Sequence, residues 1–292
     1  MSLRKTGFTF NYKNIKLITM KIISLTESNE HVDLKKFAGG ECHVKFLTEF
    51  SEGDRIRINT RLNTSDDIMN LCMAVDALRN MHVPYIEAYI PYIPYARQDR
   101  VMVPGEPLSV KVFAGILNNL QLNKVIVFDA HSDVSVALIN NCQNTPNHEM
   151  VKSFLKKFDL YDFVLVSPDL GAYKKVDKLA QKLDYKGSIA TGIKVRDLST
   201  GQIIKSDVNT DNLNGKTCIV VDDICDGGRT FIELAAALKA KNAGDLYFIA
   251  SHGIFSHNAL DRLKEAGYKQ VGSSTSVSTI SESDFYKHYN LF

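Results

Sequence analysis

Short apolar runs alternate with longer amphipathic segments along this chain of 292 residues. The apolar runs are rich in valine and isoleucine, which is typical of strands buried in a parallel sheet. We expect strands at residues 55–59, 85–90, 124–129, 163–167, 188–193, 217–222 and 246–251. Apolar residues recur with helical spacing at residues 68–80, 108–120, 172–183, 230–241 and 258–266. This alternation predicts an α/β protein with parallel sheets.

The order of these elements occurs twice along the chain. A strand followed by polar residues, a helix, a second strand and a third strand ending in aspartate come once before and once after about residue 148. We therefore expect two tandem doubly wound parallel-sheet domains, residues 1–148 and 149–292. The stretch at residues 205–214 is polar and rich in turn formers, which predicts a mobile loop.

The net charge, the apolar runs and the cysteines limit which binding partners and which cellular setting we expect. The formal net charge is +2, so no overall electrostatic attraction draws the chain to nucleic acid or to an anionic membrane. Apolar runs are too short for a membrane span, and we expect neither nucleic acid nor membrane as a partner. The five cysteines are scattered and form no C-x-x-C pair, which favours a reducing cytoplasmic setting over a disulfide or zinc scaffold.

The strongest chemical signal is the segment TCIVVDDICDGGRT at residues 217–230. Its apolar strand delivers two aspartates to the carboxyl end, where open α/β sheets bind ligands. A glycine-bearing turn then leads into a helix, whose free N–H groups favour phosphate. The alternative is an ordinary strand–turn–helix connection with a capping aspartate. The candidate sugar-phosphate ligands are Asp222, Asp223, Asp226, Gly227, Gly228, Arg229 and Thr230.

This segment resembles the phosphoribosyl-diphosphate loop shared by type I phosphoribosyltransferases and the synthetases that make their substrate. Residues 92–100, YIPYARQDR, are similar to the ATP-site segment of the synthetases, which the transferases lack, and residues 37–41 resemble the synthetase adenine-site element. The resemblance implies ATP binding by Phe37, Glu41, Arg97, Gln98 and Arg100. By themselves, the two arginines could equally be surface residues paired with Asp99 or Glu106.

Three further segments resemble the same family. Residues 128–132 and 167–171 are similar to its metal elements, which implies that Asp129, His131 and Asp169 serve Mg²⁺. The alternatives are a structural histidine and an aspartate that only caps the following helix. Lys194 and Arg196 match the basic residues of a flexible catalytic loop, and Gly192 before them would supply flexibility.

The chain is thus identified as a divergent, short member of the ribose-phosphate pyrophosphokinase family. The resemblance implies two domains of type I phosphoribosyltransferase-like fold, Mg²⁺ as cofactor with ATP as co-substrate, and a homo-oligomer, dimer or hexamer. The expected reaction moves the diphosphoryl group of ATP to the 1-hydroxyl of ribose 5-phosphate.

Alternatives remain because the phosphate loop departs from the family pattern. Arg229 adds a cation where the family has glycine, which would suit a larger 5-substituted ribose such as ADP-ribose, with a place in NAD metabolism. Equally, Arg229 could pair with Glu233 at helical spacing. A phosphoribosyltransferase and a non-catalytic regulatory homologue are the other two readings.

Overall fold

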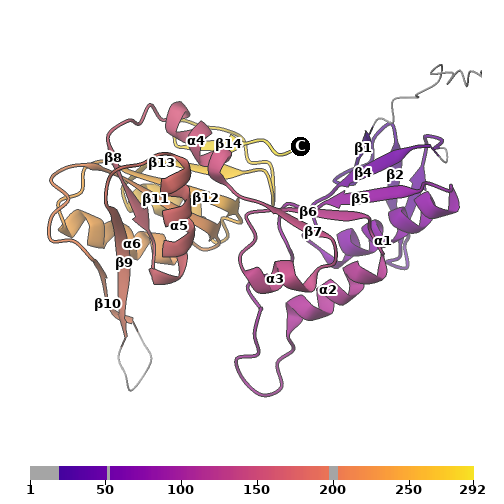
Figure 1. Ribbon diagram of the computed structural model, residues 1–292, viewed down its shortest axis with the longest axis horizontal. Helices are drawn as coiled ribbons and strands as arrows, with labels where there is room; N and C mark the ends of the chain where they lie inside the picture. Colours follow the sequence, from indigo (N-terminus) through magenta and orange to yellow (C-terminus); the bar gives the residue numbers. More distant parts are fainter. Residues whose placement is uncertain (1–19, 51–52, 197–202) are drawn as a thin grey trace, which may run out of the picture.

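The computed structural model describes residues 20–50, 53–196 and 203–292, with backbone only at 194–196 and 203–205. Two open sheets stand side by side, each with its own helices (Figure 1). The expected α/β architecture with two tandem, mainly parallel sheets is confirmed. None of the described helices is long and apolar enough to cross a lipid bilayer.

Five parallel strands form the first sheet, in the order β1-β4-β5-β6-β7. Their bounds are β1 Met20–Ser24, β4 Arg55–Asn59, β5 Tyr85–Tyr89, β6 Lys124–Phe128 and β7 Cys142–Thr145. A separate hairpin pairs β2 (Val32–Lys36) with β3 (Cys42–Phe46). Helices α1 (Ser65–Asn80) and α2 (Ser109–Asn119) bury their apolar stripes against this sheet, and the short α3 (Asp133–Leu138) follows β6.

Seven strands form the second sheet, in the order β10-β9-β8-β11-β12-β13-β14. Their bounds are β8 Phe163–Ser167, β9 Ile189–Arg196, β10 Ile203–Val208, β11 Thr217–Cys225, β12 Leu246–Gly253, β13 Tyr268–Ser274 and β14 Tyr286–Tyr289. Only β10 is antiparallel to its neighbour. Alternate strand residues feed two cores, one under α4 (His148–Lys157) and α5 (Leu170–Lys182), the other under α6 (Arg229–Ala240) and α7 (Ala259–Glu265). This sheet is therefore doubly wound.

Every strand and helix expected above is present, with ends shifted by a few residues. Elements that the apolar pattern did not predict lie mostly at sheet edges. The edge strand β7 reads Cys-Gln-Asn-Thr and is largely exposed, so it has no apolar run to mark it. The predicted loop at residues 205–214 was wrong in its first part, because β10 extends to Val208 and pairs with β9 along the sheet edge.

Candidate active site

The carboxyl ends of the two sheets meet at one seam. Strand β6 of the first sheet runs into Asp129, which adopts a left-handed backbone with φ 40°, and then into His131. The Nδ1 atom of His131 lies 2.9 Å from Oδ2 of Asp223, at the end of central strand β11 in the second sheet. The structure therefore brings a predicted metal residue and a predicted sugar residue into direct contact.

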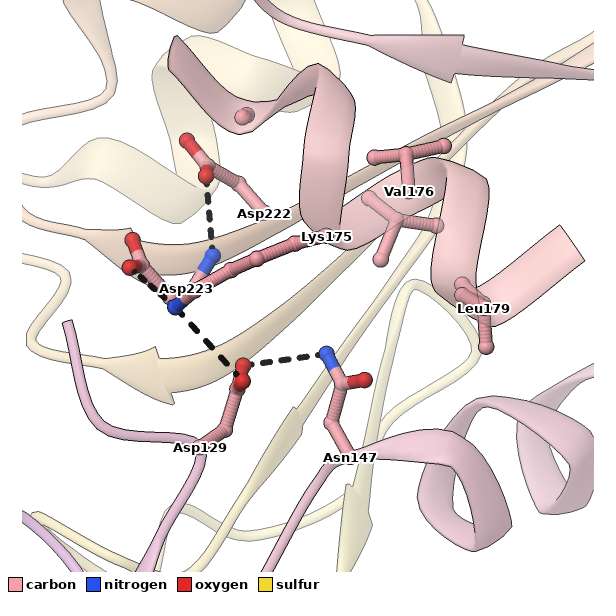
Figure 2. Close-up of a pocket in the computed structure, with 9 residues that line it drawn as sticks. Asp129, Asn147, Lys175, Val176, Leu179, Asp222 and Asp223 are labelled. Atoms are coloured by element: carbon pink, nitrogen blue, oxygen red, sulfur yellow. Dashed lines mark hydrogen bonds and ion pairs between the residues drawn. The ribbon is translucent and has the colours of Figure 1, made fainter. Parts of the chain in front are cut away.

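Lys175 is the functional candidate that the sequence reasoning missed. Its ammonium donates to Oδ2 of Asp223 at 2.8 Å and lies 3.6 Å from Oδ1 of Asp129 (Figure 2). It also donates to the carbonyl oxygen of Ala130 at 2.8 Å. A signal was present in the sequence. Lys175 falls at a core-facing position of the helical stripe that also holds Val176 and Leu179, where a lysine is unusual without a buried partner.

Asp129 is buried and its carboxylate accepts hydrogen bonds from the segment before α4 and from β12. Its Oδ2 accepts hydrogen bonds from Nδ2 of Asn147 at 3.0 Å and from the Ser251 hydroxyl. Asn147 also donates to the Ser251 oxygen at 2.9 Å. Burial raises the pKa of Asp129, and the nearby Lys175 and Ser251 partly offset that rise. The carboxylate thus helps to hold the seam closed.

The adjacent aspartates at the end of β11 differ in electrostatic environment. Burial acts to raise the pKa of Asp223, but the hydrogen bonds and charges of His131 and Lys175 outweigh it, so this carboxyl lies below its ordinary range. Burial and the neighbouring Asp223 carboxylate raise the pKa of Asp222 well above its usual value. The pair therefore divides into an ionised member and a member that retains a proton more readily.

His252 connects the two sheets from the interior. Its Nδ1 lies 2.8 Å from the Ser276 hydroxyl, and its Nε2 lies 3.3 Å from the carbonyl oxygen of Asp129. The ring of Tyr92 packs against the imidazole with a centroid separation of 5.0 Å. Burial lowers the pKa of His252 to about 4, so the imidazole is neutral at physiological pH.

The glycine-bearing turn opens helix α6 as expected. Gly228 precedes the helix with φ 76°, a left-handed conformation that favours glycine. Asp226 accepts hydrogen bonds from the Ser256 hydroxyl at 2.6 Å and from Nη1 of Arg97 at 2.8 Å. The pKa of Asp226 lies below its ordinary value because of these two hydrogen bonds. Through the Arg97 contact, the predicted ATP segment touches the predicted sugar-phosphate loop.

Two of the predicted phosphate-binding arginines are paired locally. Arg100 Nε lies 3.3 Å from the Asp99 carboxylate, and its side chain is largely exposed. Arg229 Nε lies 2.8 Å from the Glu233 carboxylate one helical turn later. Both contacts are the simpler alternatives raised by the sequence. The backbone of Gln98 is fixed by a hydrogen bond within its own turn, and its side chain is exposed.

The remaining predicted residues lie on the β2–β3 hairpin, on β9 and at the start of α6. Phe37 and Glu41 close the β2–β3 hairpin, where Phe37 is 52% exposed and packs near the ring of His43. The backbones of Lys194 and Arg196 lie in β9, and their side chains are outside the described part of the structure. Thr230 lies in the first turn of α6.

The predicted metal residues already have partners within the protein. Oδ1 of Asp169 accepts from the backbone N–H of Ala172 at 3.1 Å and so caps α5, as the alternative reading proposed. In the part of the chain that is described, no group of three or more histidine, cysteine or acidic side chains has a geometry suited to a metal ion. Asp129 and His131 face Lys175 and Asp223 instead.

Two family models match the chain in tandem. Residues 12–120 match the N-terminal domain of ribose phosphate pyrophosphokinase, and residues 147–289 match the phosphoribosyl transferase domain. The ribose-phosphate pyrophosphokinase of Fusobacterium nucleatum is 30% identical over 252 residues, which cover 84% of this chain and 78% of that protein. The Vibrio cholerae enzyme of the same name is 30% identical over 256 residues, covering 85% and 79%.

A solved structure has the same fold. The phosphoribosylpyrophosphate synthetase of Mycobacterium smegmatis superposes with a TM-score of 0.80 over 93% of this chain and 94% of that one, at 24% identity. Its architecture matches both sheets of the present chain, so the prediction of type I phosphoribosyltransferase-like domains is confirmed.

Proposed function

This chain belongs to the ribose-phosphate pyrophosphokinase family, and on that premise we propose that it converts ATP and ribose 5-phosphate into phosphoribosyl diphosphate and AMP. The 1-hydroxyl oxygen of the sugar attacks the β-phosphorus of ATP and loses its proton. The bond from that phosphorus to the α-phosphate bridging oxygen breaks, and AMP leaves. We take residues 1–148 and 149–292 as its two domains. The end of β7 at Thr145 and the start of α4, which packs on the second sheet, at His148 support a division near this point.

The contact between Arg97 and Asp226 is the observation that carries this proposal. It joins the segment assigned to ATP with the loop assigned to the sugar phosphate, although the two are 129 residues apart in sequence. A diphosphoryl transfer requires the two substrates to face each other at reacting distance. The His131–Asp223 contact supports the same arrangement from the neighbouring strands.

Arg97 forms an ion pair with a carboxylate that the ATP phosphates replace in this proposal. Its side chain is 51% exposed and pairs with Asp226, which lies in the turn before α6. A planar guanidinium prefers a bidentate phosphate to a single exposed carboxylate oxygen. ATP binding transfers Arg97 to the triphosphate, and this frees Asp226 and the N-terminus of α6 for the sugar phosphate.

Lys194 and Arg196 supply the mobile positive charge. Strand β8 pairs with β9 only over Ile189–Thr191, so the rest of β9 leaves the sheet as a two-stranded ribbon with β10 (Figure 1). This ribbon can move without breaking the central sheet. Closure over the substrates brings two cations to the transferring diphosphoryl group and stabilises its developing charge.

In this proposal Mg²⁺ would be bound to the nucleotide and would neutralise charge on the triphosphate. Mg²⁺ is held in nucleotide sites by phosphate oxygens, water and one or two protein groups rather than by a complete protein cage. His131, whose side chain is 37% exposed, and Asp169 at the start of α5 are the groups positioned to meet Mg–ATP. Asp129 was also expected to serve Mg²⁺. Its Oδ2 accepts hydrogen bonds from Asn147 and Ser251, and this favours His131 and Asp169 over Asp129 in that role.

The acceptor sugar is ribose 5-phosphate in the first instance. Arg229 is engaged by Glu233, so the extra cation in the phosphate loop already has a partner, and this weakens the argument for ADP-ribose. A chain with separate ATP and sugar segments is also difficult to reconcile with a phosphoribosyltransferase, which takes no ATP.

The test is to incubate the protein with Mg–ATP and either sugar and to follow products by phosphorus NMR. We expect a 1-diphosphate on ribose 5-phosphate together with equimolar AMP. Lys194→Ala should lower the rate about 10²–10³-fold, whereas Lys186→Ala, an exposed lysine paired with Asp184, should leave it unchanged. No AMP with either sugar, or diphosphate release that requires a nucleobase, would overturn the proposal.

Two further parts of the proposal concern the setting of the protein. The five cysteines are free thiols, which supports a reducing cytoplasm.

An exposed apolar groove between α1 and α2, lined in part by Met69, Tyr95, Val112 and Ile116, supports a homo-oligomer, dimer or hexamer. Light scattering at several protein concentrations measures the assembly, and a monomer at all of them would contradict it.

A further inference from the structure

Carboxylates from both sheets converge on a single ammonium at the seam. Asp129 comes from the end of the first sheet's β6, and Asp222 and Asp223 come from the end of β11 in the second. Lys175, on α5, is the cation in contact with two of them (Figure 2). Its other hydrogen bond, to the Ala130 carbonyl, fixes the backbone one residue before His131.

The cavity that Asp129 and Lys175 share with the two aspartates of β11 is too small for a hydrated metal ion. A separate pocket of about 500 Å³, which Asp129 and Lys175 also line, includes His131 but neither Asp222 nor Asp223. The cavity lined by Asp129, Lys175, Asp222 and Asp223 has a volume of about 10 Å³, which is at or below the room that one water needs. Mg²⁺ demands near-octahedral coordination and usually keeps several waters. In addition, Asn147 and Ser251 already occupy Oδ2 of Asp129, and Oδ1 faces the ammonium at 3.6 Å.

The contacts of Lys175 are those of an ion-paired ammonium. It donates to the Asp223 carboxylate at 2.8 Å and lies 3.6 Å from the Asp129 carboxylate. The side chain is 39% exposed, so part of its charge remains available to an incoming anion.

We propose that Lys175 is the resident cation of this site: its ammonium holds Asp129 and Asp223 together in the place that a divalent metal would otherwise take. By fixing Oδ2 of Asp223, which also contacts His131, Lys175 acts as a positioning residue for the histidine across the seam. Its effect on turnover rests on the proposed function, whereas its effect on metal binding and stability does not.

Lys175→Ala is the direct test, with Lys174→Ala on the exposed face of the same helix as the matched control. Mn²⁺ is titrated into protein without nucleotide and followed by electron paramagnetic resonance, and Tm is measured with and without Mn²⁺. Removing the ammonium leaves three carboxylates facing an opened space. We expect Lys175→Ala to lose roughly 5–10 °C in Tm, to bind one Mn²⁺, and to recover part of that Tm with the metal. Wild type and Lys174→Ala should show neither the Mn²⁺ signal nor the recovery.

Several results would overturn the inference. One is a nucleotide-free Mn²⁺ site in the wild type that Asp129→Asn removes, and another is a Lys175→Ala variant as stable as wild type and unchanged by Mn²⁺. If Lys175→Ala does not fold, Lys175→Arg decides, because it keeps the charge. A Lys175→Arg variant that keeps the wild-type Tm and binds no Mn²⁺ supports the inference. A Tm more than ~5 °C below wild type in this variant contradicts it. Absence of AMP formation by wild type would refute the proposed function and leave this test intact.

Discussion

Lowering the pH from 7.5 to 5 should destabilise this protein through one buried histidine. His252 is buried at the seam, where its ring lies between Tyr92 and the backbone of Asp129, and its pKa lies at about 4 against an ordinary 6.5. Between these two pH values the unfolded chain takes up a proton that the folded chain does not. Stability is therefore fully present above pH 6.5 and is lost as the pH falls toward 4.

The size of the effect follows from the two pKa values. One unit of difference corresponds to about 1.4 kcal/mol, so the step from pH 6.5 to pH 5 removes about 2 kcal/mol of unfolding free energy through His252. His148, whose pKa is also lowered by burial, acts in the same direction in every variant that retains it. We therefore compare how much unfolding free energy each variant loses on acidification.

Urea unfolding at pH 7.5 and pH 5, monitored by circular dichroism, provides the measurement. His252→Gln should lower stability at pH 7.5 and should lose about 2 kcal/mol less than wild type on acidification. His43→Gln, at an exposed strand position, serves as the control and should follow wild type. Equal acid losses in wild type and His252→Gln would refute the reasoning.

Three other substitutions test the seam and its approaches. Asn147→Ala removes two buried hydrogen bonds, one of them to a carboxylate, and should lower the free energy of unfolding in urea by about 2–4 kcal/mol. A loss below about 0.5 kcal/mol, the size of an ordinary surface substitution, would contradict this prediction. Gly192→Ala places a Cβ 2.3 Å from the Pro168 carbonyl oxygen and should lower Tm, whereas Gly115→Ala, with no atom within 4 Å of its Cβ, should hold or raise it. Arg97→Ala should change stability by less than about 1 kcal/mol and raise KM for ATP, and an unchanged KM would remove Arg97 from the ATP site.

The clash that a Cβ would make at position 192 also changes the role that we assign to Gly192. Its position before Lys194 suggested a flexible hinge. In the structure Gly192 lies within β9, and the absence of a side chain allows close approach of the Pro168 backbone. Gly228 is the glycine at the site whose backbone conformation requires it.

The sequence alone determined the features that are recorded in contiguous residues. A parallel strand that is buried on both faces carries a nearly continuous apolar run, so β8 and the apolar parts of β11 and β12 could be predicted from the sequence. The acidic, glycine-bearing turn before α6 could also be predicted, because a strand end, a left-handed glycine and a helix N-terminus follow one another within a few residues. The two-domain α/β fold and the sugar-phosphate loop came from such local signals.

Only the tertiary structure decided how these parts combine at the seam. Lys175, Asn147 and Ser251 reach Asp129 from three segments that are 18 to 122 residues away from it, and no local pattern records which buried carboxylate a donor will meet. Edge strands such as β7 were likewise invisible, since an exposed strand needs no apolar face. The physical reason is the same in both cases: hydrophobic periodicity reports burial along one element, whereas hydrogen bonds and charge pairing depend on which elements pack together.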